Sequence, residues 1–235
     1  MLRTVSRVFV DQPVEHESRS ELALVPHDLG ARGTLTVSSE SADSLLLVRS
    51  GTGKLSLGGR GHELDEGSAA LVLATETATL TAGGDGLRIV LTSVGPYVDL
   101  HAPIGPRAVV VAQDGAGEAS ATGKRSFRIL FGPHNGSTRA TLFVGHIPPG
   151  RARWHYHLYD EIVWVHEGLG RLHLDGGVEE LCPGVAFRLH AREVHIVENS
   201  SAGEMTVLGL FTPAGSPSAA YLPAGSEGAY AFAKD

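Results

Sequence analysis

The sequence predicts an all-β protein built from two similar domains. Apolar runs of the kind that form strands recur along its 235 residues, among them 162–165, 172–174 and 185–189. Glycine is abundant, with 30 residues, and no long stretch has the 3.6-residue apolar period of an amphipathic helix. We therefore expect strands joined by tight turns throughout the chain.

The second half of the chain repeats the first half at a constant offset. Gly51 and Gly67 lie 117 residues before Gly168 and Gly184 (168 − 51 and 184 − 67). The same offset joins four further pairs: Gly53 and Gly170, Leu55 and Leu172, Leu57 and Leu174, Leu64 and Leu181. Self-similarity of this kind implies two copies of one β-domain.

The repeat divides the chain into two domains of ordinary size. We expect a first domain over residues 1–110, a connection over 111–125, and a second domain over 126–235 that includes an extended tail from near Pro213. The connection contains the sequence AQDGAGEASATG. This segment is small, polar and rich in glycine, which is typical of a linker.

Four candidate metal ligands lie in the second copy. His155 and His157 are separated by one residue, and alternate side chains of a strand point the same way, so the two imidazoles are expected to form a chelating pair. Glu161 follows closely, and His195 lies 34 residues further on (195 − 161). Both adjoin apolar runs, which predicts neighbouring strands of one sheet. Three imidazoles and one carboxylate form a donor set for a divalent transition metal.

This spacing resembles the two sequence motifs of the cupin family. The residues that carry the resemblance are Gly150, His155, His157, Glu161 and Gly168 in the first motif, and Gly184, His190, Arg192, His195 and Asn199 in the second. Only four residues separate Gly150 from His155, and histidine and arginine replace a proline and a glycine of the second motif. Glycine there permits backbone angles that arginine tolerates poorly. The resemblance implies tandem jelly-roll type β-barrels, or a bicupin, with one Fe, Mn, Ni, Co, Cu or Zn ion.

The first copy lacks this donor set. At the offset of 117, the four ligand positions fall on Ser38, Glu40, Ser44 and Ala78. One carboxylate among two hydroxyls and a methyl group does not hold a transition metal tightly. We therefore expect residues 1–110 to form a degenerate, metal-free partner of the second domain.

Residues near the ligands are candidates for a substrate pocket. The candidates are His146, Arg151, Arg153, Tyr159, Val163 and Arg188. An arginine could hold a carboxylate or enolate, because the guanidinium fork suits oxyanions. Val163 shares a strand face with Glu161, whereas Trp164 is expected on the opposite face, between the domains. Asn199 is expected either to support a ligand from outside the coordination shell or to be an ordinary turn residue.

The expected chemistry is Lewis-acid activation with open coordination positions. The resemblance implies a small-molecule enzyme, and we favour a dioxygenase, an oxygen-dependent oxidoreductase acting on a chelating enol, catechol or hydroxy-ketone. A non-oxidative isomerase, cyclase or lyase is the first alternative. A metal-dependent binding or sensor protein without catalysis is the second.

Composition argues against several other classes. The net charge is −7 and no stripe of lysine or arginine is present, so nucleic acid is not an expected partner. No apolar stretch approaches the roughly 20 residues needed to span a bilayer, and the first residues lack the apolar core of a secretory signal. Cys182 is the single cysteine, which excludes an intrachain disulfide. We expect a soluble cytoplasmic protein with a small-molecule substrate. The sequence leaves open whether the protein forms a homodimer.

Overall fold

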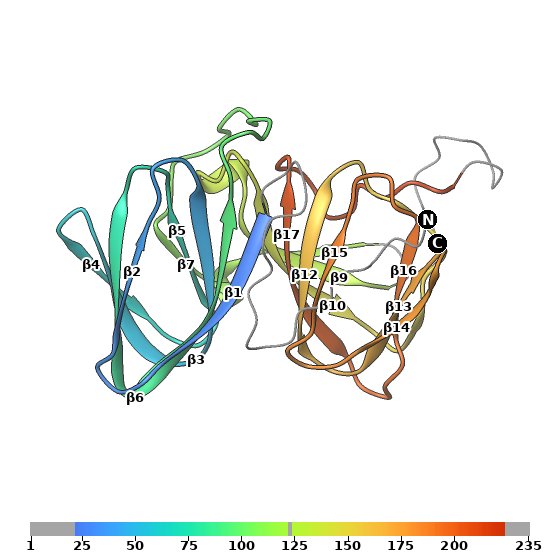
Figure 1. Ribbon diagram of the computed structural model, residues 1–235, viewed down its shortest axis with the longest axis horizontal. Coiled ribbons are helices and arrows are strands. Elements are labelled where there is room, and N and C mark those ends of the chain that lie inside the picture. The colour runs from blue at the N-terminus through green and yellow to red at the C-terminus, as the bar shows by residue number, and fades with distance from the viewer. Residues whose placement is uncertain (1–21, 122–123, 224–235) are drawn as a thin grey trace.

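The computed structural model describes residues 22–121 and 124–223, and it confirms the all-β class. Residues 1–21, 122–123 and 224–235 of the expected domains and linker lie outside this description. The strands fall into two groups that lie side by side, the first in blue and green and the second in yellow to red (Figure 1).

The first group is one seven-stranded sheet, in the order β1-β6-β3-β5-β7, with β2 paired to β6 and β4 to β3. Its elements are β1 (Leu22–Leu29), β2 (Thr34–Ser38), β3 (Asp43–Leu57), β4 (Arg60–Leu64), β5 (Ser68–Val72), β6 (Thr77–Val94) and β7 (Val110–Ala112). The long strands β3 and β6 pair with two register shifts, near Val48 and Gly51. Such shifts bend a sheet, and they let this one wrap around its own apolar core.

The second group forms two sheets, one of six strands in the order β15-β12-β17-β10-β9-β8 and one of four in the order β11-β16-β13-β14. Its strands are β8 (Glu118–Ser120), β9 (Ser126–Phe131), β10 (Thr141–Ile147), β11 (Gly150–Arg151), β12 (Asp160–Glu167), β13 (Gly170–Leu174), β14 (Gly177–Leu181), β15 (Ala186–Leu189), β16 (His195–Asn199) and β17 (Met205–Thr212). Two short 3-10 helices are η1 (Gln113–Gly115) and η2 (Pro133–Asn135). Residues from both sheets share one apolar cluster, which places that cluster between them.

The segment expected to be a linker carries ordered elements. β7 pairs with β5 of the first group, and β8 forms a hairpin with β9 of the second. The chain therefore passes between the groups through residues 113–117, and β8 already belongs to the second group.

Backbone conformation follows the 117-residue repeat. Gly51 and Gly168 share a left-handed conformation (φ 84° and 89°), and so do Gly67 and Gly184 (φ 79° and 88°). The same offset joins two residues that are not glycine. Thr75 has φ 71° and Arg192 has φ 66°. Arg192 thus adopts a left-handed backbone conformation, which costs arginine more conformational energy than glycine. The turn before His195 therefore has the same left-handed residue as the matching turn of the first copy.

The two groups pack through a shared hydrophobic cluster. It combines side chains of β1, β3, β5 and β6 with side chains of β9, β10, β12 and β17. Trp164 of β12 is 1% exposed in this cluster, whereas Val163 faces the interior of the second barrel. The alternation expected for this strand is confirmed. A buried hydrogen bond of 2.5 Å from Arg188 Nη2 to the Leu22 carbonyl also crosses the interface.

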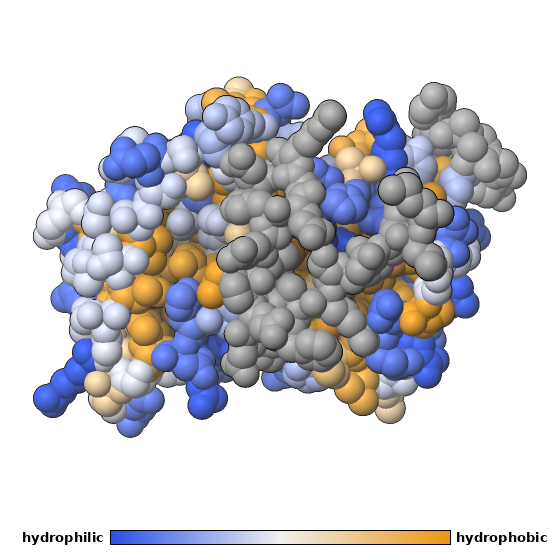
Figure 2. Space-filling view, in the orientation of Figure 1, coloured by the Kyte–Doolittle hydropathy of each residue, from blue (hydrophilic) through white to orange (hydrophobic). Residues whose placement is uncertain are grey.

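The surface is mixed in polarity. On the face drawn in Figure 2, hydrophilic residues cover much of the outline of both halves and hydrophobic residues are visible between them. The most exposed large apolar side chains are Tyr97, Leu100 and Ile104, which lie between β6 and β7. No helix in the described residues is long and apolar enough to cross a membrane.

Candidate metal centre

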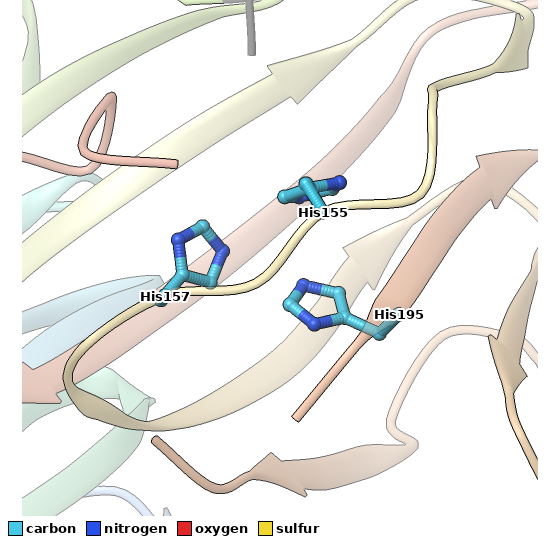
Figure 3. Close-up of side chains that lie close together, drawn as sticks. All are labelled: His155, His157 and His195. Atoms are coloured by element: carbon cyan, nitrogen blue, oxygen red, sulfur yellow. The ribbon is translucent and has the colours of Figure 1, made fainter. Parts of the chain in front are cut away.

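Three histidines converge inside the second barrel. Each of His155, His157 and His195 offers one ring nitrogen, and these atoms lie within 4.8 Å of one another. Figure 3 shows His155 and His157 on one extended segment and His195 at the start of β16, with the rings turned toward one another. The backbones of His155 and His195 pair directly, through N–H to carbonyl bonds of 3.2 and 2.8 Å. The rings are therefore positioned by main-chain geometry.

The hydrogen bonds of the three imidazoles select one tautomer. The Nδ1 atoms of His155 and His195 each lie 2.8 Å from a backbone carbonyl, those of Arg153 and Glu193. His157 Nδ1 lies 3.3 Å from the Ala219 carbonyl. A carbonyl only accepts hydrogen bonds, so each Nδ1 carries the proton and each Nε2 keeps its lone pair. Backbone contacts of this kind fix the tautomer and orientation of metal-binding histidines.

Burial keeps the same three rings neutral. It lowers the pKa of His157 to about 3, and the neighbouring His155 adds to the shift. It lowers the pKa of His195 well below its ordinary value and that of His155 in the same direction. Neutral imidazole is the form that binds metals. The cluster is therefore in its ligating form at neutral pH.

Glu161 lies beside this cluster. Its Oε2 is 4.0 Å from His157 Nε2, and burial raises the pKa of its carboxyl to about 8. Glu161 is on β12 of the six-stranded sheet, whereas His195 is on β16 of the four-stranded sheet. The expectation that they occupy neighbouring strands of one sheet is wrong, because the second barrel is built from two separate sheets. The three imidazoles lie close together, and the carboxylate lies next to His157.

The donor set fits a divalent transition metal. Imidazole nitrogen and carboxylate oxygen suit Fe, Mn, Ni, Co, Cu and Zn alike, so the ligands do not select among them. Within residues 22–121 and 124–223, the three histidines are the one group of histidine, cysteine or acidic side chains close enough together to hold an ion. At the matched positions of the first copy, Ser38 and Glu40 are exposed and Ala78 is buried in an apolar core.

A small cavity of about 100 Å³ adjoins the histidines and Glu161. Phe127 and Phe143 contribute to its apolar wall, and residues of the tail after β17, including Ala220, close one side. Tyr156 and Tyr221 pair through their backbones and hold the tail in place. The site is thus enclosed by the barrel together with the tail.

The candidate pocket residues divide into two sets. His146, Tyr159 and Val163 line the cavity. Tyr159 stacks on His157, with 4.6 Å between ring centroids, and burial raises the pKa of its hydroxyl well above the ordinary value. His146 Nδ1 also lies 2.9 Å from Glu204 Oε1.

The other candidates lie away from the cavity. Arg151 and Arg153 are exposed, and the Arg151 guanidinium lies 5.7 Å from the ring centroid of Trp154. Arg188 is on the interdomain face of β15. Asn199 is 2% exposed, and its Nδ2 donates to the carbonyls of Ile147 and Gly203, both at 2.7 Å. These bonds tie β16 to the end of β10 and to the turn before β17, and they do not involve a histidine.

Arg125 is the cavity cation that sequence reasoning missed. It lies in the turn between β8 and β9, lines the cavity, and donates through Nη2 to the Val197 carbonyl. Burial lowers the pKa of its guanidinium to about 10, and its charge lowers the pKa of all three histidines. Among the described residues, no carboxylate forms an ion pair with it. The linker-like composition around it gave no signal of this position.

A family comparison agrees with this geometry. Residues 143–211, which carry all three histidines and Glu161, match the cupin domain family. This segment is therefore similar to a cupin domain. No curated protein is significantly similar to the chain in sequence.

Solved structures extend the likeness beyond this segment. An oxalate decarboxylase of Bacillus subtilis, studied for its Mn(II) centres, is 13% identical, with a TM-score of 0.67 over 84% of this chain and 70% of that one. A putative glyoxylate-induced protein of Pseudomonas aeruginosa is 16% identical, with a TM-score of 0.70 over 88% of this chain and 79% of that one. At these identities the likeness establishes a shared fold, and it extends over both halves of the chain.

Proposed function

We propose that the cupin domain binds one divalent transition metal through His155, His157, His195 and Glu161. The observation that carries the proposal is the common tautomer of three buried imidazoles, each with Nδ1 at a backbone carbonyl and Nε2 free to coordinate. Glu161 supplies a carboxylate on the opposite wall of the barrel. A preformed donor set of this kind needs little rearrangement to bind an ion.

We propose further that the first half is a metal-free cupin-like domain. Residues 22–112 form their own sheet, and the repeat relates their left-handed turns to those of the second half. The position matched to His195 is Ala78, which is fully buried among apolar side chains. The expected stoichiometry is therefore one ion per chain.

The substrate that fits this site is compact and anionic. A cavity of about 100 Å³ is well below the 300–1,000 Å³ typical of drug-sized ligands. Arg125 is a desolvated cation without a carboxylate partner in the described chain, and a charged oxygen of the substrate would complete its hydrogen bonding. Arg125 takes the role that the sequence assigned to Arg151, Arg153 or Arg188.

A bound ion supplies Lewis acidity and vacant coordination positions for a chelating substrate. Arg125 holds and orients the anionic end of the substrate. Phe127 and Phe143 exclude water, which strengthens the attraction between Arg125 and the substrate. Tyr159 keeps its proton and packs against His157, so it restrains that ring.

The proposed activity is that of a metal-dependent enzyme on a small chelating acid, enol, catechol or hydroxy-ketone. An oxygen-dependent oxidation is the reaction class that the cupin resemblance favours. Non-oxidative lyase, isomerase or cyclase chemistry is the alternative, and the similarity of fold to an oxalate decarboxylase supports it. Metal-dependent ligand binding without turnover is the third possibility.

Elemental analysis of protein purified without added metal tests the first step. We expect close to one transition ion per chain, and His157→Ala should empty the site. His101→Ala is the matched control, because His101 is exposed and remote from the cavity. Two ions per chain would refute the asymmetry between the halves, and full occupancy of His157→Ala would refute the ligand set.

Oxygen uptake separates the reaction classes. The metal-loaded protein is mixed with a panel of small hydroxy acids, keto acids, enols and catechols, with and without oxygen. Consumption of oxygen together with product supports the oxidative reaction. Equal turnover without oxygen supports the lyase or isomerase alternative, and ligand-dependent metal spectra without product under either condition support the binding protein.

A further inference from the structure

A second cavity lies between the two halves, outside the cupin barrel. Its volume is about 250 Å³, which exceeds that of the cavity beside the histidines. β3 and the turn before β5 form one wall, and β12, β17 and the segment around η1 form the others. β12 and β17 contribute to both cavities: Glu161 and Val163 line the one beside the histidines, His166 lines the other, and Val207 lines both.

Three buried polar atoms without a hydrogen-bond partner lie at or beside this cavity: Arg49 and His166 line it, and Trp164 packs against both of them. In the described part of the chain they are Arg49 Nε, Trp164 Nε1 and His166 Nδ1. The Arg49 guanidinium carbon lies 4.6 Å from the ring centroid of Trp164, whose ring centroid is 5.6 Å from that of His166. Nearly all buried polar groups of native proteins are paired. The two unpaired groups that line the cavity indicate a missing partner, and because Arg49 can only donate, that partner accepts hydrogen bonds.

The charge of Arg49 specifies the partner further. Arg49 forms no ion pair with any described carboxylate, and burial lowers the pKa of its guanidinium more than the charge of Asp28 raises it. A negatively charged acceptor therefore fits this end of the cavity better than a neutral one. A carboxylate also matches the planar guanidinium fork.

The mouth of the cavity has the opposite charge. Glu66 and Asp114 line it, and both are exposed, whereas Arg49 and His166 are partly buried and Trp164 is fully buried. Two carboxylates at the mouth disfavour a simple anion. They favour a ligand that carries a positive group on its outer side.

We propose that this interdomain cavity binds a small zwitterion of the α-amino acid class. The ligand carboxylate meets Arg49 and His166, and its ammonium group faces Glu66 and Asp114. The cavity volume, below the range of drug-sized ligands, suits such a molecule. This site shares no proposed metal ligand with the cupin centre, so the inference does not depend on the proposed enzyme activity.

The test is titration of the full-length protein with glycine and L-alanine, followed by calorimetry and thermal unfolding, with and without metal. We expect saturable binding and a rise in the unfolding midpoint. Arg49→Gln should weaken binding about 10- to 100-fold, the value of a hydrogen bond to a charged group. Arg60→Gln, an exposed arginine on β4, is the matched control and should bind normally. His157→Ala should also bind normally.

Ligands that carry only one of the two charged groups of glycine distinguish a zwitterion site from an anion site. In the native protein, acetate and methylammonium should each bind more weakly than glycine. In the double variant Glu66→Gln and Asp114→Asn, the preference of the site for glycine over acetate should fall. Equal binding of acetate and glycine to the native protein, full binding by Arg49→Gln, or a cavity that holds ordered water and binds neither amino acid overturns the proposal.

Discussion

Replacing Arg125 by glutamine should separate substrate binding from metal binding, because the two are expected to change in opposite directions. The variant removes a partly buried positive charge that lines the cavity and lies close enough to lower the pKa of all three histidines. Loss of that charge weakens attraction for an anion and removes repulsion of a cation. Metal affinity should therefore stay the same or rise, while affinity for a carboxylate falls.

The magnitude follows from the contacts of Arg125. The bond to the Val197 carbonyl uses Nη2, which leaves other guanidinium donors for a ligand. A hydrogen bond to a charged group contributes about 1.5–3 kcal/mol. This corresponds to roughly 10- to 150-fold in a dissociation constant, since 1.4 kcal/mol is about tenfold. Arg125→Lys should give an intermediate loss, because it keeps the charge and loses the fork.

Cobalt-loaded protein offers a direct assay, with oxalate and glyoxylate as probes and the visible spectrum of the metal as the readout. Arg153→Gln is the matched control, because Arg153 is exposed and adjoins the ligand segment outside the cavity. The reasoning is refuted if Arg125→Gln binds both probes as tightly as the native protein. It is also refuted if metal affinity falls in parallel with probe affinity, which would make Arg125 a structural support for the histidines.

Three further predictions concern the support of the site. Asn199→Ala should lower the free energy of unfolding by about 1–3 kcal/mol, because it removes the buried hydrogen bond to the Ile147 carbonyl, while metal affinity measured by chelator competition stays within a few-fold. A loss of affinity without a loss of stability would contradict this. Arg192→Gly should raise the denaturant midpoint, with a gain in the free energy of unfolding of up to about 1 kcal/mol. Glycine relieves the left-handed strain at φ 66°, and the greater freedom it gives the unfolded chain offsets part of that gain. A lowered midpoint would argue against strain. Metal affinity should rise about tenfold per pH unit up to about pH 8 and then level off, because the Glu161 carboxyl holds a proton below its pKa of about 8 and must release that proton to coordinate. The histidines are already neutral in this range and add no further dependence on pH. Affinity that does not change between about pH 6 and 8 would count against Glu161 as a ligand.

The ligand cluster could be read from the sequence because its spacing is local. His155 and His157 are two residues apart, and an extended backbone alone brings their rings to one side. The strand parity of Val163 and Trp164 followed from the same rule, and the structure confirms it. The pairing of Glu161 and His195 was predicted wrongly, because sequence periodicity does not say where one sheet ends and the facing sheet begins.

The positions of Arg125 and Arg188 could not be predicted from the sequence. Arg125 reaches the cavity because β8 and β9 fold as a hairpin that lies beside the barrel, and its surrounding sequence has the composition of a linker. Arg188 stood out as an arginine where the first copy has a leucine. This difference indicated an unusual environment. In the structure Arg188 lies at the interdomain face, where its Nη2 donates a hydrogen bond to the Leu22 carbonyl.

The shared left-handed turns give the two halves an experimental use. Thr75 and Arg192 are chemically unrelated, yet they adopt the same backbone conformation 117 residues apart. The fold thus specifies the path of the main chain at this turn independently of the residue type, although the two halves differ in how their strands are divided into sheets. Thr75 therefore serves as an internal reference for Arg192. A property that both turns share belongs to the backbone conformation, and a property confined to the second turn belongs to the side chains around it.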